Sequence, residues 1–143
     1  EGGIRVPMIA RWPGHIQPGD QSEHISGFQD VLPTLAEIAG KGIANTDGIS
    51  FLPTLLGDAS NQKKHPYLYW EFYEQGGKRA VRKGFWKAVQ RDILRRDDAS
   101  VELYDLTQDL AETNDVSNQY PALVAEMKRM MDVSHTDRTD LGL

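Results

Sequence analysis

The stretch EGGIRVPMIARWPG, residues 1–14, carries an apolar pattern that suits a β-strand, yet no second strand pattern lies near it in the sequence. Its apolar residues are Ile4, Val6, Met8, Ile9 and Ala10. A central or parallel strand needs hydrogen-bonding partners on both sides for its backbone N–H and C=O groups. We therefore expect Arg5 to Trp12 to form a strand whose neighbours are not all in this chain, and this expectation constrains the fold most.

Two helix starts of similar sequence follow the predicted strand. In DVLPTLAEIAG, Asp30 is a suitable N-cap, Pro33 fits the first turn and Gly40 suits the end of the helix. The spacing places these apolar residues on one helix face: Leu32, Leu35, Ile38 and Ala39. SFLPTLLGD, residues 50–58, repeats the arrangement with Ser50 as the cap and predicts a second, shorter helix.

The second half of the chain has the texture of a small sheet. The polar, turn-rich stretch GDASNQKKHP, residues 57–66, is the best candidate boundary. Beyond it, PYLYWEFYE predicts a strand, KRAVRKGFWKAVQ predicts a hairpin that turns at Lys83–Gly84, and VELYDL predicts a further short strand. The last element is a helix from about Pro121 to Val133, with an apolar stripe of Leu123, Met127, Met130 and Met131.

This order of elements predicts a mixed α/β (α+β) fold in two parts. Residues 61–143 can close on themselves as a small antiparallel sheet covered by one helix. Residues 1–60 contain one strand and its helices, and they form the C-terminal strand-helix part of a larger α/β domain. In the first predicted strand of the sheet, Leu68, Trp70 and Phe72 share one face, and Tyr67, Tyr69, Glu71 and Tyr73 share the other.

Composition excludes several classes of protein. The 143 residues contain no cysteine, which excludes disulfides, thiolate nucleophiles and cysteine metal sites. No apolar run approaches the roughly 18 residues of a membrane span. The net charge is −5, with eight basic residues between Lys78 and Arg96 and seven acidic residues between Asp97 and Asp115. The basic block is typical of a phosphate-binding patch, but we expect opposite charges on neighbouring strands to pair, and we predict no nucleic-acid partner.

No catalytic constellation is visible in the residues themselves. The four histidines, His15, His24, His65 and His135, do not have the spacing of helical metal ligands, so we predict no metal site. There is no G-x-S-x-G nucleophile motif, no G-x-G-x-x-G and no P-loop.

Five segments, in order, resemble the C-terminal third of the sulfatase family, the arylsulfatases of the alkaline-phosphatase-like superfamily. They are EGGIRVPMIARWPG, DVLPTLAEIAG, DGISFLPTLLGD, YWEFYEQGGKRAVRKGFWKAV and ELYDLTQDLAETNDV. The resemblance implies that the catalytic set lies upstream: a lysine five residues before the Glu1 position, a formylglycine made in a C/S-x-P-x-R motif, and calcium ligands. None of these is in this chain, so the chain alone is expected to be inactive and to bind no cofactor.

The resemblance also sets expectations for the whole enzyme. It implies hydrolysis of sulfate esters, on a sulfated glycan or an aryl sulfate, in the periplasm or outside the cell. The remainder of the sulfatase chain is the expected partner. A sulfate ester needs a nucleophile at sulfur, neutralisation of the sulfuryl oxygens and an acid for the leaving oxygen.

The connection YEQGGK is the candidate substrate-binding site. Tyr73, Glu74, Gln75 and Lys78 offer an aromatic ring, an acceptor, an amide and a cation, which suit a sugar with hydroxyls and a sulfate. By this resemblance, many bacterial relatives carry histidine at the position of Tyr73, in a segment E-F-H-E. This chain has E-F-Y-E, so Tyr73 changes the polarity at that position.

Two alternatives stay open at the level of the sequence. One is a phosphodiesterase or phosphonate hydrolase of the same superfamily, which an upstream threonine or serine nucleophile would indicate. The other is a stand-alone glycan-binding or structural module, which an exposed aromatic set of Tyr67, Tyr69 and Tyr73 would favour.

Overall fold

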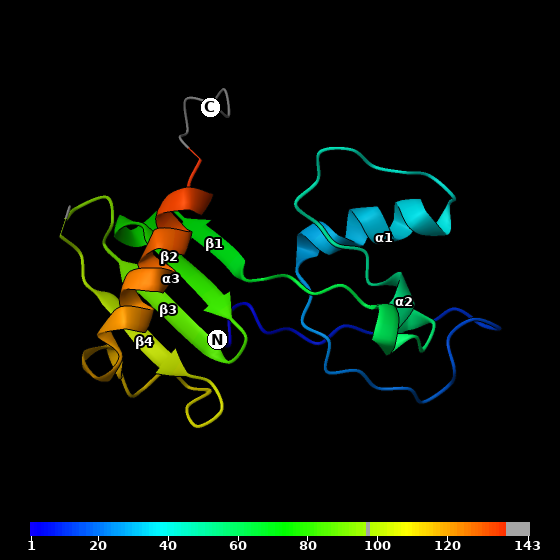
Figure 1. Cartoon of the computed structure of the whole chain (residues 1–143), viewed down its shortest axis with the longest axis horizontal. Helices are drawn as coiled ribbons and strands as arrows, with labels where there is room; N and C mark the ends of the chain where they lie inside the picture. The colour runs from blue at the N-terminus through cyan, green and yellow to red at the C-terminus, as the bar shows by residue number, and fades with distance from the viewer. Residues whose placement is uncertain (97, 137–143) are drawn as a thin grey trace. The chain divides into compact units, whose positions relative to one another are not determined.

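A computed structural model describes residues 1–96 and 98–136, which form two compact units (Figure 1). One unit is Val6–His65, and the other combines Glu1–Arg5 with the chain from Pro66 onward. The assignment of residues 1–60 to a larger catalytic domain stays a prediction. In the described residues, no helix has the length and apolar character needed to span a membrane.

Both predicted helices form in the unit Val6–His65. A 3₁₀ turn, η1 (Phe28–Asp30), leads into α1 (Val31–Ile38), and the short α2 (Leu52–Leu55) is followed by η2 (Ala59–Asn61). Gly40 and Gly57 follow the two α-helices with φ of 65° and 76°, the left-handed conformation in which helices commonly end. The predicted helix stops are therefore confirmed.

The predicted strand at Arg5 to Trp12 is wrong: these residues lie outside every helix and strand that the structure describes. A strand exists only as part of a hydrogen-bonded ladder, and the four described strands pair only with one another. The expected exposure of its apolar side chains is nevertheless found, because Val6, Met8 and Ile9 are 60%, 57% and 95% exposed.

Asp30 does not cap α1 with its side chain, contrary to expectation. Its carboxylate is fully buried and accepts hydrogen bonds from the backbone N–H of Gly27 and of Ile49, each at 2.7 Å. His65 Nε2 lies 2.8 Å from the same carboxylate. Asp30 therefore holds three separate parts of this unit around the start of α1, which a cap to its own helix would not do.

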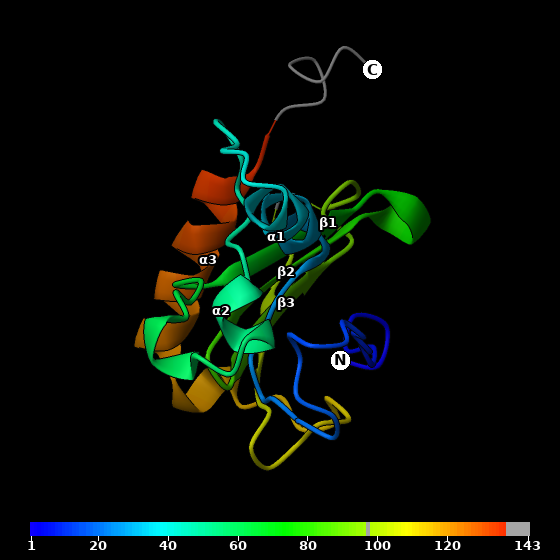
Figure 2. The ribbon, with the colours of Figure 1, turned by 90° about the vertical axis from the view of Figure 1, so that its right-hand side faces the viewer.

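The other unit contains a four-stranded antiparallel sheet in the order β1-β2-β3-β4. Its strands are β1 (Leu68–Phe72), β2 (Lys78–Lys83), β3 (Trp86–Arg91) and β4 (Val101–Asp105). The β2–β3 hairpin turns at Gly84–Phe85, one residue later than predicted, with Gly84 at a φ of 58°. Helix α3 (Pro121–Ser134), preceded by η4 (Ser117–Gln119), lies along one face of the sheet (Figure 2).

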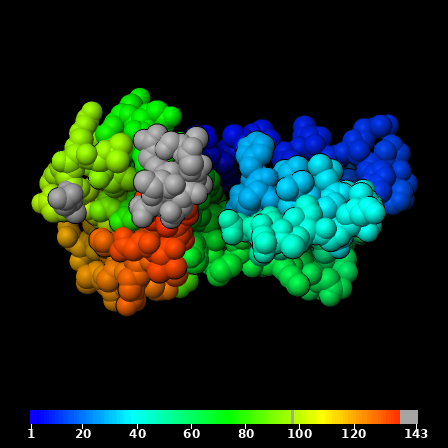
Figure 3. Space-filling model, turned by 90° about the horizontal axis from the view of Figure 1, so that it is seen from above, coloured from blue at the N-terminus to red at the C-terminus, as the bar shows by residue number. Residues whose placement is uncertain are grey.

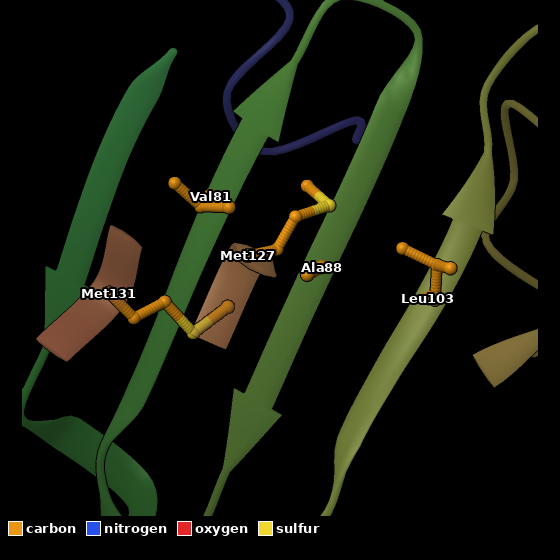
Figure 4. Packing of buried hydrophobic residues seen from close by; sticks show 5 residues of the cluster. All are labelled: Val81, Ala88, Leu103, Met127 and Met131. Atoms are coloured by element: carbon orange, nitrogen blue, oxygen red, sulfur yellow. The ribbon is translucent and has the colours of Figure 1, made fainter. Parts of the chain in front are cut away.

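The core of this unit lies between the sheet and α3. Val81, Ala88 and Leu103 come from the three strands β2, β3 and β4, and they are directly paired across the sheet. Met127 and Met131 of α3 pack against them, and all five side chains are fully buried (Figure 4). The predicted methionine stripe is therefore core packing, as its spacing indicated.

The register reverses the expected exposure of the tyrosine face of β1. Tyr69 is paired with Val81, so it lies on the face that α3 covers. Tyr67 packs against the same core, and its hydroxyl lies 3.0 Å from Ser134 Oγ near the end of α3. Two of the three tyrosines proposed for a glycan-binding module, Tyr67 and Tyr69, are thus packed against the core that α3 covers.

Most of the basic block is paired with carboxylates. Arg91 of β3 bonds Glu102 of β4 at 2.9 Å, as expected for neighbouring strands. Arg82 and Lys87, which are direct partners across β2 and β3, both contact the buried Glu1 side chain, at 2.7 and 3.2 Å. Lys87 also contacts Glu112. These basic residues of the block therefore pair with carboxylates of the same unit, as expected from the sequence.

We predict that Met131→Ala lowers the free energy of unfolding by about 2–4 kcal/mol, because it leaves a cavity between α3 and the sheet. Urea unfolding followed by tryptophan fluorescence measures this loss. Val133→Ala on the same helix is the control: Val133 is 81% exposed, and its truncation should stay within about 0.5 kcal/mol. Equal effects of the two substitutions would contradict the packing described here.

Candidate functional site

The predicted substrate-binding residues lie in and around the connection between β1 and β2. Tyr73 directly follows β1 and is half-buried, whereas Glu74 and Gln75 are exposed in a short 3₁₀ turn, η3 (Glu74–Gly76). Gln75 adopts a left-handed conformation with φ 56°, and its side-chain oxygen accepts a hydrogen bond from Lys78 Nζ at 3.1 Å. The loop therefore exposes the carboxylate of Glu74 and the amide of Gln75 to solvent. Lys78, where β2 begins, is held by its hydrogen bond to Gln75.

A polar hollow of about 330 Å³ lies beside this loop. Its lining residues come from β1, the β1–β2 connection, β2, β3, the β3–β4 connection and the residue that follows α3: Glu71, Tyr73, Arg79, Gln90, Ile93, Leu94, Arg96 and His135. Of the four residues predicted from the sequence, Tyr73 lines the hollow, and Glu74, Gln75 and Lys78 do not. The structure thus brings one predicted residue together with seven that the sequence did not single out.

Alternation along β1 was the available signal for part of this set. Glu71 and Tyr73 share a strand face by their spacing, and Arg79 is directly paired with Gln90 in the β2–β3 ladder. No local pattern could connect these residues to His135, which lies 64 positions beyond Glu71 in the sequence. That contact exists because α3 packs across the sheet.

The carboxylate of Glu71, which lines the hollow, is contacted by several side chains. His135 Nδ1 lies 2.9 and 3.1 Å from its two carboxylate oxygens, and the Tyr69 hydroxyl donates to it as well. Burial alone would raise the pKa of Glu71, but the hydrogen bonds from His135, Tyr69 and Tyr73 outweigh it and hold the pKa below its ordinary value. Burial and the bond to Glu71 raise the pKa of Tyr69, which keeps its hydroxyl a donor.

Arg79 is directly paired with Glu71 across β1 and β2, so the two side chains lie next to each other on one face of the sheet, and Arg79 is itself held by two partners. Its Nε donates to Gln90 Oε1 at 2.7 Å, and its Nη2 donates to Asp132 Oδ1 of α3, also at 2.7 Å. Gln90 is buried and donates its amide to the carbonyl of Ala99. The guanidinium is therefore fixed in place by the sheet and the helix together.

Gly77 allows the β1–β2 loop to approach the β3–β4 connection closely. It has a φ of 79°, and a Cβ at this position would lie 2.7 Å from side-chain atoms of both Ile93 and Leu94. The Leu94 N–H donates to the carbonyl of Gly76 at 3.0 Å. Any larger residue at Gly77 would be strained in its backbone and would displace the apolar edge of the hollow.

The sulfatase resemblance implies calcium ligands and a formylglycine for the whole enzyme, and the expectation is that they lie outside this chain. Within residues 1–96 and 98–136, no group of three or more histidine, aspartate or glutamate side chains is placed to hold a metal ion. The sequence has no cysteine and no S-x-P-x-R segment from which formylglycine would be made.

We predict that Glu71→Gln reduces the acid sensitivity of folding. Because the pKa of Glu71 is lowered by folding, its stabilising contribution is complete above its ordinary pKa of 4.5 and is lost as the pH falls through the lowered value. The melting temperature, measured from pH 7 to about pH 3, should therefore fall less steeply for the variant. Glu74→Gln changes an exposed carboxylate nearby and should keep the wild-type profile; identical profiles for all three proteins would contradict the assignment.

Comparisons with known proteins agree with the fold just described. The chain is 44% identical to arylsulfatase A of Bos taurus over 92 residues, which are 62% of this chain and 18% of that protein. It is 28% identical to the N-acetylgalactosamine-6-O-sulfatase of Bacteroides thetaiotaomicron, covering 92% of this chain and 27% of that protein. The chain therefore spans less than a third of the length of these relatives.

Two solved structures are also similar to this chain in fold. A protein of Bacteroides thetaiotaomicron VPI-5482 assigned to the sulfatases matches with a TM-score of 0.61 and 32% identity, over 72% of this chain and 23% of that one. The phosphonate monoester hydrolase SpPMH of Silicibacter pomeroyi has a TM-score of 0.59 and 24% identity, over 84% and 26% of the two chains, and so shares the fold.

Residues 1–137 match the family described as N-sulphoglucosamine sulphohydrolase, C-terminal. This match extends over both units and nearly the whole chain, and it agrees with the arrangement of a small antiparallel sheet under one helix. The chain belongs to this family of sulfatase C-terminal domains.

Proposed function

We propose that this chain works as the C-terminal part of an enzyme that hydrolyses sulfate esters. The observation that carries the proposal is the family match over residues 1–137, which includes the β1–β2 loop and the hollow beside it. The catalytic residues belong to the rest of that enzyme. The role of this chain is to bind substrate at a distance from the sulfur and to complete the fold.

A sulfated glycan is the substrate class that fits the candidate site best. The relative that spans 92% of this chain is an N-acetylgalactosamine-6-O-sulfatase, so a glycan-directed member exists within the same family. Tyr73, Glu74, Gln75 and Lys78 together present an aromatic ring, an acceptor, an amide and a cation. Sugars are bound by such mixtures of apolar surface and a few placed polar groups.

The unit Val6–His65 carries an apolar surface that the remainder of the enzyme would cover. A hollow of about 390 Å³ is lined largely by apolar side chains, among them Met8, Ile9, Trp12, Leu35, Phe51 and Leu55. The helix α1 and the loop that follows it can be seen in Figure 3. On α1, Leu32 and Leu35 are 61% and 58% exposed. Exposed apolar patches of this kind mark contact surfaces, which supports the remainder of a sulfatase chain as the partner.

Calcium and a formylglycine nucleophile are proposed for the rest of the enzyme, where they would neutralise the sulfuryl oxygens and attack sulfur. This chain contributes no ligand to either. Location in the periplasm or outside the cell is part of the same proposal. It rests on the resemblance to sulfatases alone.

A phosphonate or phosphodiester hydrolase is the second candidate, because the shared fold with a phosphonate monoester hydrolase does not separate the two activities. The full-length protein, assayed on an aryl sulfate, a sulfated oligosaccharide and a phenyl phosphonate ester, distinguishes them. Release of sulfate as the faster reaction supports the proposal. Faster cleavage of the phosphonate would overturn it.

We predict that the 143-residue chain alone does not hydrolyse a chromogenic aryl sulfate, with or without added calcium. The reason is chemical, since the chain has no cysteine and no S-x-P-x-R segment from which formylglycine would be made. The assay uses chain purified from an expression host that has no sulfatase of its own. Calcium-dependent turnover that follows the chain through purification would show that the reasoning fails.

We predict that Glu74→Ala combined with Gln75→Ala, made in the full-length enzyme, lowers kcat/KM on the natural glycan about tenfold and leaves aryl sulfate hydrolysis nearly unchanged. A tenfold effect corresponds to the loss of roughly 1.4 kcal/mol of contact with the remote part of the substrate. Glu23→Ala, which changes an exposed acid on another loop, is the control. An equal loss on both substrates would indicate a folding defect, and no loss on either would remove the loop from the site.

A further inference from the structure

The hollow beside the β1–β2 loop combines polar walls with an apolar edge. Its polar side is made of Glu71, Arg79 and His135, and its apolar edge is made of Ile93 and Leu94, the latter 58% exposed. With about 330 Å³, it lies at the small end of the roughly 300–1,000 Å³ typical of ligand pockets. That size suits a single ring-shaped ligand with hydroxyl groups.

The charges around the hollow decide between a neutral and an anionic ligand. The guanidinium of Arg79 is paired with Asp132 at 2.7 Å, and that of Arg96 is paired with Asp98 at 3.5 Å. Glu71 adds a carboxylate whose pKa is held low, so it is charged at neutral pH. Both cations thus already have a carboxylate partner, and a third carboxylate faces the same space, which disfavours entry of a sulfate or carboxylate group.

The hydrogen-bonding groups that remain suit hydroxyls. Arg79 is fixed by Gln90 and Asp132 through Nε and Nη2, and a guanidinium carries donors on three nitrogens. Glu71 has two oxygens with several lone-pair positions and can accept from a ligand hydroxyl beside its protein donors. Because Arg79 and Glu71 are held by the sheet and by α3, ligand binding would cost little ordering of side chains.

We propose that this hollow is a subsite for an uncharged sugar ring. The hydroxyls would contact Arg79 and Glu71, and the apolar face of the ring would lie on Leu94 and Ile93. The inference deepens the proposed function, since it names the sugar unit that the C-terminal part of a sulfatase would hold. It predicts that charge on this unit weakens binding.

The test measures binding to the 143-residue chain, without any hydrolysis. The ¹⁵N-labelled chain is titrated with the methyl glycosides of galactose and N-acetylgalactosamine, with N-acetylgalactosamine 6-sulfate, and with inorganic sulfate alone. Saturable shifts of the amides of Gly76, Gly77, Ile93 and Leu94 are expected with a neutral sugar. Leu94→Ala should weaken that binding about fivefold through lost apolar contact, and Leu110→Ala, an exposed leucine elsewhere, should not.

Arg96→Gln separates the two ligand classes, because it removes a charge and keeps a donor. Affinity for the neutral sugar should stay within about twofold of wild type. The inference is overturned if no sugar shifts these amides, if inorganic sulfate competes with the neutral sugar, or if the sulfated sugar binds more tightly and loses that advantage in Arg96→Gln. A dispersed spectrum of each variant verifies folding, and the result is independent of whether the full-length enzyme releases sulfate.

Discussion

Packing of α3 across the four-stranded sheet is the interaction on which the candidate site depends. Met127 and Met131 fill the space over Val81, Ala88 and Leu103, and this fixes both the position and the direction of the helix. Because the helix is fixed, its C-terminal end delivers Asp132 to Arg79 and places His135 against Glu71. The hollow is thus lined by residues of the sheet and by His135, which lie far apart in the sequence and are brought together by the apolar core.

The elements that the sequence predicts well are those determined by local chemistry. Both α-helices of the first unit, the hairpin near Gly84 and the methionine stripe of α3 follow from glycine conformation and from spacing. Two other features depend on distant partners and were missed. Arg5 to Trp12 has strand-forming residues but no neighbouring strand, and Asp30 faces a loop and a histidine brought to it by the fold.

The candidate site shows the same division between local and distant information. The sequence selects Tyr73, Glu74, Gln75 and Lys78 because they surround a glycine pair in a short connection, and the structure confirms that the connection is a tight turn with left-handed residues. It does not reveal that the adjoining hollow is lined by Arg79 and His135, because their approach requires the sheet register and the helix packing. A composition argument would also describe this region as basic, whereas the two arginines that line the hollow, Arg79 and Arg96, are each paired with a carboxylate.

Glu1 limits how the unit that contains the sheet can be produced without the unit Val6–His65. Its buried side chain rests on Arg82 and Lys87, and Glu1–Arg5 belongs to the same unit as the sheet, so that unit is discontinuous in the sequence. A recombinant piece that starts at residue 61 would keep every strand and α3 and would still lose this carboxylate. Lys87 would then keep Glu112 as a carboxylate partner, whereas Arg82 on the adjacent strand would lose the carboxylate that it contacts, at a site where water has limited access. A shortened domain that retains its native electrostatics would need residues 1–5 joined to Pro66 by a linker that replaces the whole unit Val6–His65.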